Sequence, residues 1–222
     1  MAAITFKPLT ETLFQYVQTQ FVQESDALKA LREFALQHEF SHKMTSPEQT
    51  QFLCFLLKLI GAKRVIEVGT FVGYTTLAMA EALPDEGEVV TCEKNEAWLT
   101  MGQPFWAQAP CAHKISVCLD DALISLQNLI DEGQAASFDF IYVDADKRHY
   151  ERYLELGLQL INSRGLLVFD NVLRVIHGDV ADPGTPATRA LDRFNKQLHA
   201  RADLDVSVLP MNDGVLLLRR RW

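Results

Sequence analysis

The stretch Val65-Ile66-Glu67-Val68-Gly69-Thr70-Phe71-Val72-Gly73-Tyr74 decides the fold of this chain. A β-branched run ends in an acid, a turn with two glycines follows, and a helical pattern begins at Tyr74. Such a strand, tight turn and helix N-terminus is the place where an open α/β sheet binds a nucleotide-like ligand. Glycine suits this turn because it takes positive φ and lets the backbone approach a ligand closely.

The spacing of the turn indicates the class of ligand. Gly69 and Gly73 form Gly-x-x-x-Gly, which differs from the Gly-x-Gly-x-x-Gly that cradles a pyrophosphate. Glu67 would repel a phosphate but suits a ligand that carries an ammonium or another cation. The turn therefore favours S-adenosylmethionine over a nicotinamide cofactor. The alternative interpretation of the two glycines is ordinary close packing.

Length and composition predict one globular α/β domain over residues 1–222. The chain has 48% apolar residues and a net charge of -8, which argues against a strong electrostatic grip on nucleic acid. The only dense basic cluster, Arg219 to Arg221, is interpreted as a solvated strand end. Neither a signal peptide nor an apolar stretch long enough to span a bilayer is visible, so we expect a cytoplasmic protein with no membrane partner. The four cysteines match no zinc-site spacing, and Cys54, Cys92 and Cys118 are expected to be reduced core residues.

Three helices are expected before the first strand. Residues 9–20 and 26–38 have amphipathic patterns. The third helix starts with Ser46 as N-cap, Pro47 as first helical residue and Gln49 as reciprocal partner in a capping box. It is nearly all apolar as far as Ile60, so we expect it to be buried.

Strands and helices then alternate, which indicates a parallel sheet covered on both faces. The expected strands are 64–68, 88–93, 114–119, 138–144 and 165–170, and the expected helices are 74–83, 95–108, 122–132, 148–161 and 186–200. The chain should close with a hairpin of residues 205–209 and 215–219, joined by the turn Asn212-Asp213-Gly214.

An acid ends the second expected strand. Glu93 lies 24 residues beyond Gly69, the spacing at which a carboxylate accepts both ribose hydroxyls of a bound nucleoside. The alternatives are a solvent-facing strand end and a cap for the next helix.

Oxygen-bearing side chains follow two further strands. Asp144 ends one buried strand, and Asp170 and Asn171 end the next. Neighbouring parallel strands place such ends side by side, so the three side chains could converge on a hard cation such as Mg²⁺ or Ca²⁺. The alternative is that each carboxylate caps the helix that follows it.

Lys147 comes three residues after Asp144. A lysine beside a cation should have a lowered pKa, because like charge disfavours its protonated form. That would suit a general base acting on a phenolic hydroxyl. The alternative is a surface lysine at a helix start.

Taken together, these motifs resemble those of the cation-dependent O-methyltransferases, the caffeoyl-coenzyme-A type and its bacterial relatives, which are related to catechol O-methyltransferase. The resemblance rests on Met44–Gln49, Glu67–Thr75, Val143–Lys147, Phe169–Leu173 and Leu209–Gly214, which follow in the family's order. It implies a Rossmann-like class I methyltransferase fold with a seven-stranded, mostly parallel sheet and a C-terminal antiparallel hairpin. It also implies S-adenosylmethionine as cofactor and a homodimer, with residues 1–43 forming substrate or dimer elements.

The resemblance also implies roles for individual residues. Glu67, Gly69 and Thr75 would contact the methionine part of the cofactor, Glu93 its ribose, and Asp121 and Ala122 its adenine, while Thr45, Asp144 and Tyr153 would complete that pocket. Asp144, Asp170 and Asn171 would bind the divalent cation, Mg²⁺ first and Ca²⁺ or Mn²⁺ as alternatives. Lys147 would be the catalytic base beside Asp144, and the acceptor would meet Met44, Arg174 and Asp213.

The loop after Asp170-Asn171 departs from the family pattern. Many relatives carry Trp where this chain has Arg174, and the segment Arg174–Asp179 looks longer than usual. Because this loop shapes the acceptor pocket in the family, an arginine here would suit an acidic acceptor.

The expected activity is methyl transfer from S-adenosylmethionine to a hydroxyl of a small vicinal-diol, catechol-like acceptor. Two alternatives stay open at this point. One is a tRNA hydroxyuridine O-methyltransferase of the same fold, which the acidic charge balance disfavours. The other is a non-catalytic small-molecule binder, which the intact set of Asp144, Lys147, Asp170 and Asn171 disfavours.

Overall fold

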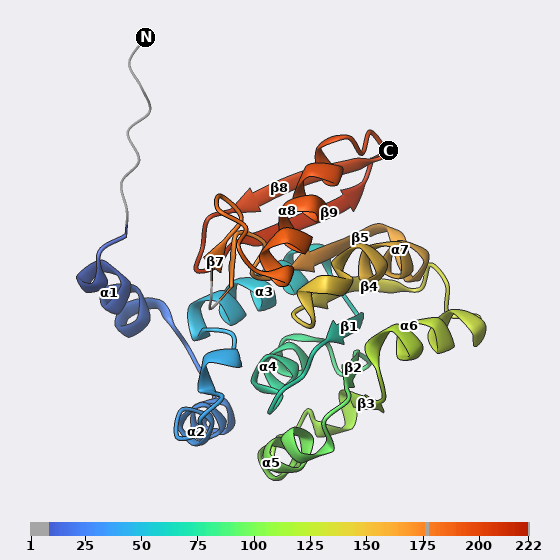
Figure 1. Cartoon of the computed structure of the whole chain (residues 1–222). Coiled ribbons are helices and arrows are strands. Elements are labelled where there is room, and N and C mark those ends of the chain that lie inside the picture. The colour runs from blue at the N-terminus through green and yellow to red at the C-terminus, as the bar shows by residue number, and fades with distance from the viewer. Residues whose placement is uncertain (1–8, 176–177, 222) are drawn as a thin grey trace.

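The computed structural model describes residues 9–175 and 178–221 and is built around one seven-stranded sheet (Figure 1). The strand order is β3-β2-β1-β4-β5-β9-β8, in which the first five strands pair in parallel and β9 pairs antiparallel with both β5 and β8. This confirms the expected class I methyltransferase architecture with its C-terminal antiparallel hairpin. The strands are β1 (Arg64–Val68), β2 (Glu88–Glu93), β3 (Ile115–Leu119), β4 (Phe138–Val143), β5 (Ile161–Phe169), β8 (Leu204–Leu209) and β9 (Val215–Arg220).

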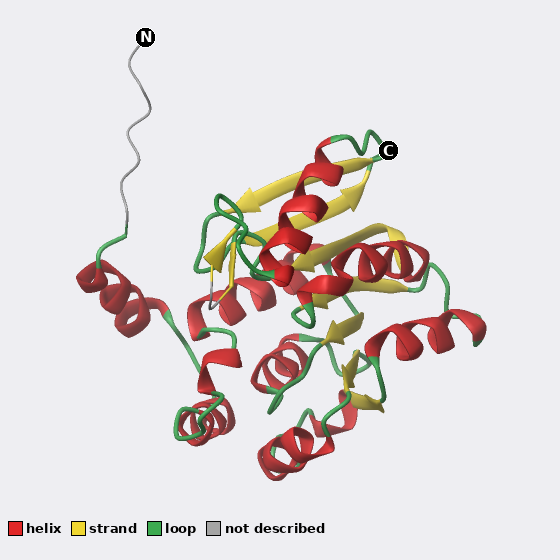
Figure 2. Ribbon diagram, in the orientation of Figure 1, coloured by secondary structure: helices red, strands yellow, loops and turns green. Residues whose placement is uncertain are grey.

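Helices connect the parallel strands and surround the sheet (Figure 2). They are α1 (Glu11–Phe21), α2 (Asp26–Ala35), α3 (Pro47–Ile60), α4 (Tyr74–Ala82), α5 (Glu96–Trp106), α6 (Ala122–Asp131), α7 (Tyr150–Leu160) and α8 (Pro186–His199). Short 3₁₀ turns at Ser41–Lys43, Ala112–Lys114 and Lys147–His149 precede α3, β3 and α7. None of the helices in the described part of the chain has the length and apolar character needed to cross a bilayer.

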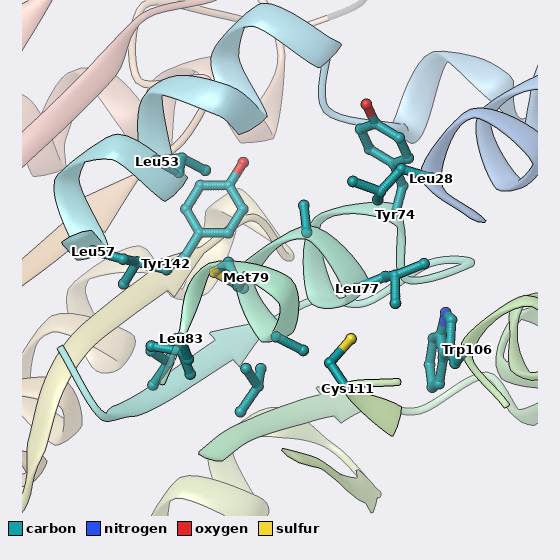
Figure 3. Close-up of a cluster of buried hydrophobic side chains, with 14 of the residues drawn as sticks. Leu28, Leu53, Leu57, Tyr74, Leu77, Met79, Leu83, Trp106, Cys111 and Tyr142 are labelled. Carbon is teal, nitrogen blue, oxygen red and sulfur yellow. The ribbon is translucent and has the colours of Figure 1, made fainter. Parts of the chain in front are cut away.

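Alternate residues of each strand face two separate apolar layers. Val65 of β1 and Phe140 and Tyr142 of β4 pack in the layer formed with α2, α3, α4 and α5. Their neighbours Ile66 and Ile141 pack in the opposite layer, with α6, α7 and α8. Figure 3 shows the first layer, in which Tyr142 rises from β4 toward Leu53 of α3. The near-continuous apolar strands are explained by this burial on both faces.

The glycine turn after β1 is packed directly against the end of β4. Gly69 has φ of 98°, and its amide donates to the Cys92 carbonyl at 3.0 Å. A Cβ atom at this position would lie 2.2 Å from the carbonyl oxygen of Asp144, so only glycine fits. The turn therefore brings the end of β1 close to the backbone of one expected cation ligand.

Two expectations about α3 are wrong. Ser46 precedes the helix as predicted but makes no capping hydrogen bond; its hydroxyl donates to Glu48 instead, and Gln49 points inward. The helix is also not buried all round, because Phe55 is 62% exposed and Leu59 is 69% exposed. One stripe of α3, with Leu53 and Leu57, faces the core, and the opposite stripe faces outward.

The segment that follows β5 forms a feature that the sequence did not predict. Arg174–Val175 (β6) and Gly178–Asp179 (β7) pair as a small antiparallel ladder beside the main sheet. Residues 176 and 177 of the unusual loop lie outside the described residues.

Candidate active site

A cavity of about 900 Å³ opens at the carboxyl ends of the parallel strands. It lies where the strand order reverses, since β2 pairs with β1 on one side and β4 pairs with it on the other. Open α/β sheets bind ligands at such a switch point because the connections leave in opposite directions and open a crevice. The topology therefore places the cavity beside the glycine turn.

The cavity brings together nearly all of the residues expected to form a site. Its lining contains Met44, Thr45, Glu67, Gly69, Thr75, Glu93, Asp121, Ala122, Asp144, Lys147, Tyr153, Asp170, Asn171 and Asp213. These residues come from the segment before α3, from the carboxyl ends of β1 to β5 with the turns and helix starts that follow them, and from the β8–β9 turn. Arg174 is the one expected residue that does not line it.

Glu67 lies beneath the glycine turn and is 1% exposed. Its Oε2 accepts hydrogen bonds from the hydroxyls of Thr76 on α4 and Thr91 on β2, the latter at 2.6 Å. Burial raises the pKa of Glu67 to about 8, and the nearby carboxylates of Asp144 and Glu93 act in the same direction. Near neutral pH this group therefore holds a proton that a cationic ligand would displace.

Glu93 braces the turn from the end of β2. Its Oε2 accepts from the amides of Thr70, at 3.3 Å, and Phe71, at 2.9 Å, and its Oε1 accepts from Lys94 and Asn95, both at 2.9 Å. The carboxylate thus combines the expected pocket position with the alternative role of capping the next segment. Binding a ribose would require it to exchange some of these backbone donors for hydroxyls.

The start of α6 lines the cavity where the adenine was expected, and two aromatic rings line it as well. Asp121 is the N-cap of α6 and accepts from the Leu123 amide at 2.9 Å. Phe71 and Trp98 pack edge to face with centroids 5.4 Å apart, and both line the cavity. Sequence reasoning missed these two rings, which no motif distinguishes from core aromatics.

The three predicted oxygen ligands stand at the ends of neighbouring strands. Asp144 follows β4 and Asp170 follows β5, and the Asp170 amide continues the sheet ladder by donating to the Val143 carbonyl at 2.9 Å. Asn171 takes a positive φ of 52° directly after Asp170. Among the described residues, none hydrogen-bonds to the side-chain amide of Asn171, which faces the cavity.

Asp170 is a buried carboxylate, 3% exposed, with donors on both oxygens. Its Oδ2 accepts from Gln49 and Tyr142, each at 2.7 Å, and its Oδ1 accepts from the Asn171 amide at 2.7 Å. Burial raises the pKa of Asp170 to about 6, helped by the negative charge of Asp144. The negative charge of Asp144 beside this buried carboxylate favours a positive charge at the same place.

A positive charge from the protein already stands at this place. Lys147 Nζ lies 2.6 Å from Asp144 Oδ1 and packs over the Tyr150 ring, 5.2 Å from its centroid. Burial alone would lower the pKa of Lys147, but the carboxylates of Asp144 and Asp170 outweigh it and raise that pKa above its ordinary value. This is the opposite of the expected direction, because the expectation assumed a metal ion in place of the ion pair.

The donor set fits a hard cation, although it contains only two carboxylates. No cluster of three or more His, Cys, Asp or Glu side chains able to hold a metal occurs among residues 9–175 and 178–221. Asp144, Asp170 and the Asn171 amide would supply oxygen ligands alone, the preference of Mg²⁺, which keeps several waters. The ion pair of Lys147 with Asp144, which the charge of Asp170 also favours, shows that this place attracts positive charge.

Arg174 lies at the rim of the cavity. Its side chain is 64% exposed, and its guanidinium reaches Asp213 Oδ1 at 4.0 Å. Asp213 belongs to the hairpin turn and lines the cavity, so it draws the arginine toward the opening. At this exposure the pair contributes little to stability and leaves the guanidinium accessible.

Sequence reasoning also missed Gln49, Tyr142 and Asn212. Gln49 shares the inward face of α3 with Leu53 and Leu57, four and eight residues on, and is 2% exposed. A polar residue on an apolar stripe was the available signal, because a buried amide needs hydrogen-bond partners. This signal was missed because the sequence pattern assigned Gln49 to a capping box.

Comparisons with known proteins give a consistent result. A family model described as O-methyltransferase matches residues 18–221. The chain is 37% identical over 221 residues to a caffeoyl-CoA O-methyltransferase of Eucalyptus gunnii, covering 95% of this chain and 88% of that protein. It is 38% identical to the catechol O-methyltransferase domain-containing protein 1 of Mus musculus, covering 95% of this chain and 80% of the relative.

Solved structures of O-methyltransferases have the same fold as this chain. The O-methyltransferase TomG of Streptomyces achromogenes, crystallised in complex with S-adenosylmethionine, superimposes with a TM-score of 0.86 at 28% identity, covering 95% of this chain and 96% of TomG. An O-methyltransferase of Bacillus cereus in complex with S-adenosylhomocysteine gives 0.84 at 27% identity, covering 95% and 97% of the two chains.

Proposed function

Because this chain belongs to the O-methyltransferase family and is an S-adenosylmethionine-dependent enzyme of the caffeoyl-CoA and catechol type, we propose that it methylates one hydroxyl of a small vicinal diol with the help of a divalent cation. The observation that carries this proposal is the group of Asp144, Asp170 and Asn171 beside Lys147, in the cavity that the glycine turn enters.

The cofactor would occupy the half of the cavity that the turn forms. Gly69 allows close approach of a ligand to the backbone, Glu67 would lie near the methionine end of the cofactor, and Glu93 would hold its ribose. Bound there, S-adenosylmethionine supplies an electrophilic methyl group on a sulfonium. The chain's own contribution is to hold the donor and the acceptor in line, because positioning supplies much of the rate in such a transfer.

The acceptor would enter between the turn and the ends of β4 and β5. A cation held by Asp144, Asp170 and Asn171 supplies Lewis acidity that lowers the pKa of the acceptor hydroxyl. Lys147 is within reach of the same point through its contact with Asp144 and takes the proton at Nζ. Loss of the Asp144 partner to a cation would remove the main cause that now raises the pKa of Lys147.

The experiment that tests the proposal is a panel of acceptors assayed with labelled cofactor. Catechols, acidic catechols, flavonoids and tRNA are each incubated with and without Mg²⁺. The proposal expects Mg²⁺-dependent methylation of a vicinal diol, and the exposed guanidinium of Arg174 favours acidic members of the panel. Transfer to tRNA alone, or equal transfer to diols in excess chelator, would overturn it.

Binding of the cofactor should release a proton. Near pH 7 Glu67 is mostly protonated because its pKa is about 8. The ammonium and sulfonium charges of the ligand favour the ionised form, so the pKa falls on binding and affinity rises with pH up to about 8. Calorimetry in buffers of different ionisation enthalpy measures the released proton. Glu67→Gln should make the binding enthalpy independent of the buffer. A binding enthalpy that is already independent of the buffer in the unmodified protein would contradict the assignment.

We also propose that the chain forms a homodimer through α1 and the outer stripe of α3. No residue of α1 is buried, and a helix of 11 residues is marginal in water without a packing surface. Leu13, Tyr16 and Phe21 of α1 are more than half exposed, as are Phe55 and Leu59 of α3. Figure 1 shows α1 at the margin of the molecule, away from the sheet.

Light scattering after size exclusion tests this interface. Phe55→Asp with Leu59→Asp should convert a dimer into a monomer, because charge in a buried apolar interface is costly. Val206→Asp, on an exposed apolar residue of edge strand β8, is the control and should leave the dimer intact. An unmodified protein with the mass of one chain would contradict the proposal.

A further inference from the structure

We infer that Gln49 and Tyr142 are positioning residues that hold the Asp170 carboxylate in the orientation needed to bind the divalent cation, and that Asn212 fixes Gln49. This inference rests on the proposed cation dependence. It assigns a role to three residues that do not themselves complete the ligand set.

Two buried donors converge on one oxygen of Asp170. Gln49 Nε2 and Tyr142 Oη each donate to Oδ2 at 2.7 Å, and the two side chains are 2% and 1% exposed. The other oxygen, Oδ1, accepts from the Asn171 amide at 2.7 Å. With a donor on each oxygen from a different direction, the carboxylate cannot rotate about its Cβ–Cγ bond without breaking bonds in a dry environment.

The hydrogen-bond partners of the Gln49 amide determine which way its oxygen and nitrogen face. Its Oε1 accepts from Asn212 Nδ2 at 3.0 Å while its Nε2 donates to Asp170. The reversed amide would face an oxygen toward the carboxylate and a donor toward a donor, so it would lose both bonds. Asn212 itself stands in the hairpin turn with φ of 50°, and its Nδ2 also reaches Ser46 Oγ at 2.8 Å.

The Tyr142 hydroxyl is oriented by a second chain of bonds. Tyr142 has one proton, which it gives to Asp170, so Thr45 Oγ1 must be the donor in the 3.0 Å contact between the two hydroxyls. Thr45 stands just before α3, in the segment that lines the cofactor side of the cavity. The carboxylate is therefore held from α3, from β4 and from the hairpin turn together.

Partners of this kind usually tune metal affinity. Removal of an outer hydrogen bond to a ligating group typically costs about 10–100-fold in metal affinity. If Gln49 and Tyr142 position Asp170 in this way, removing either donor should weaken cation binding and leave the folded cofactor pocket unchanged.

The test is a titration with Mn²⁺ alone, with the free ion counted by electron paramagnetic resonance. Gln49→Met and Tyr142→Phe should each raise the dissociation constant for Mn²⁺ by about tenfold or more. Gln51→Met is the matched control. It makes the same substitution on the same helix, and Gln51 also makes two hydrogen bonds, to Phe21 and Gln23, away from the site. The control should bind Mn²⁺ like the unmodified protein, and all variants should keep their affinity for S-adenosylhomocysteine.

The outcomes separate this inference from the proposed function. An unmodified protein that binds no Mn²⁺ would overturn both. Equal affinity for Mn²⁺ in the unmodified protein and in both variants would overturn only the positioning role of Gln49 and Tyr142. Should Gln49→Met fail to fold, Tyr142→Phe, which removes a single hydroxyl, decides the question. In turnover, raising Mg²⁺ should restore the rate of both variants, a rescue that general damage to the fold would not allow.

Discussion

Replacing Asp170 by Asn should lower methyl transfer by at least about 10²–10³-fold, because a cation that polarises the acceptor is worth several kcal/mol and each tenfold in rate is about 1.4 kcal/mol. Asparagine keeps the shape of the side chain, and its oxygen can still accept from Gln49 and Tyr142. The substitution removes the charge, and its amide nitrogen also loses the hydrogen bond that Oδ1 accepts from the Asn171 amide. Steady-state rates with a catechol and Mg²⁺ measure the loss, and excess chelator should reduce the unmodified enzyme to a similar level.

Stability supplies the control for this variant. The pKa of Asp170 is about 6 in the fold, above its ordinary value of 3.8, so the free energy of unfolding falls as the pH rises from 3.8 to about 6 and stays lowered above that pH. Asp170→Asn removes that penalty. Without metal at pH 7, this gain opposes the cost of the lost Asn171 hydrogen bond, so the variant should melt close to the unmodified protein and should bind S-adenosylhomocysteine normally. Full activity of the variant would contradict the cation site.

Replacing Lys147 by Arg should lower the rate by about 10²–10⁴-fold, the usual contribution of a general base. Arginine keeps the positive charge and can keep the ion pair with Asp144, but it does not lose its proton in proteins. The substitution thus separates a role in proton transfer from a role in charge balance. Single-turnover rates of methyl transfer, with cofactor binding measured in parallel, report the effect.

Lys196→Arg is the matched control for this measurement. Lys196 is also paired with an aspartate one turn away, Asp192, at 2.8 Å, but its side chain is 75% exposed and far from the cavity. It should turn over like the unmodified enzyme. A Lys147→Arg variant with full activity would show that Lys147 serves only to balance charge, and the proton would then leave by another route.

The sequence determined much of this protein because its strongest signals are local. Alternation of apolar strands and helices, a turn that only glycine can form, and an Asp-Gly hairpin each depend on residues a few positions apart. Since the carboxyl ends of parallel strands lie at one edge of the sheet, the sequence alone predicts that the oxygen ligands after β4 and β5 lie close together.

Only the tertiary structure decided what those groups touch. Gln49 and Asp170 are 121 residues apart, and their hydrogen bond depends on how α3 lies across the sheet. The same packing turned Gln49 from a capping residue into a buried donor and left Phe55 in water. Such contacts are set by the relative placement of elements, which hydrophobic periodicity constrains only to a face and not to an atom.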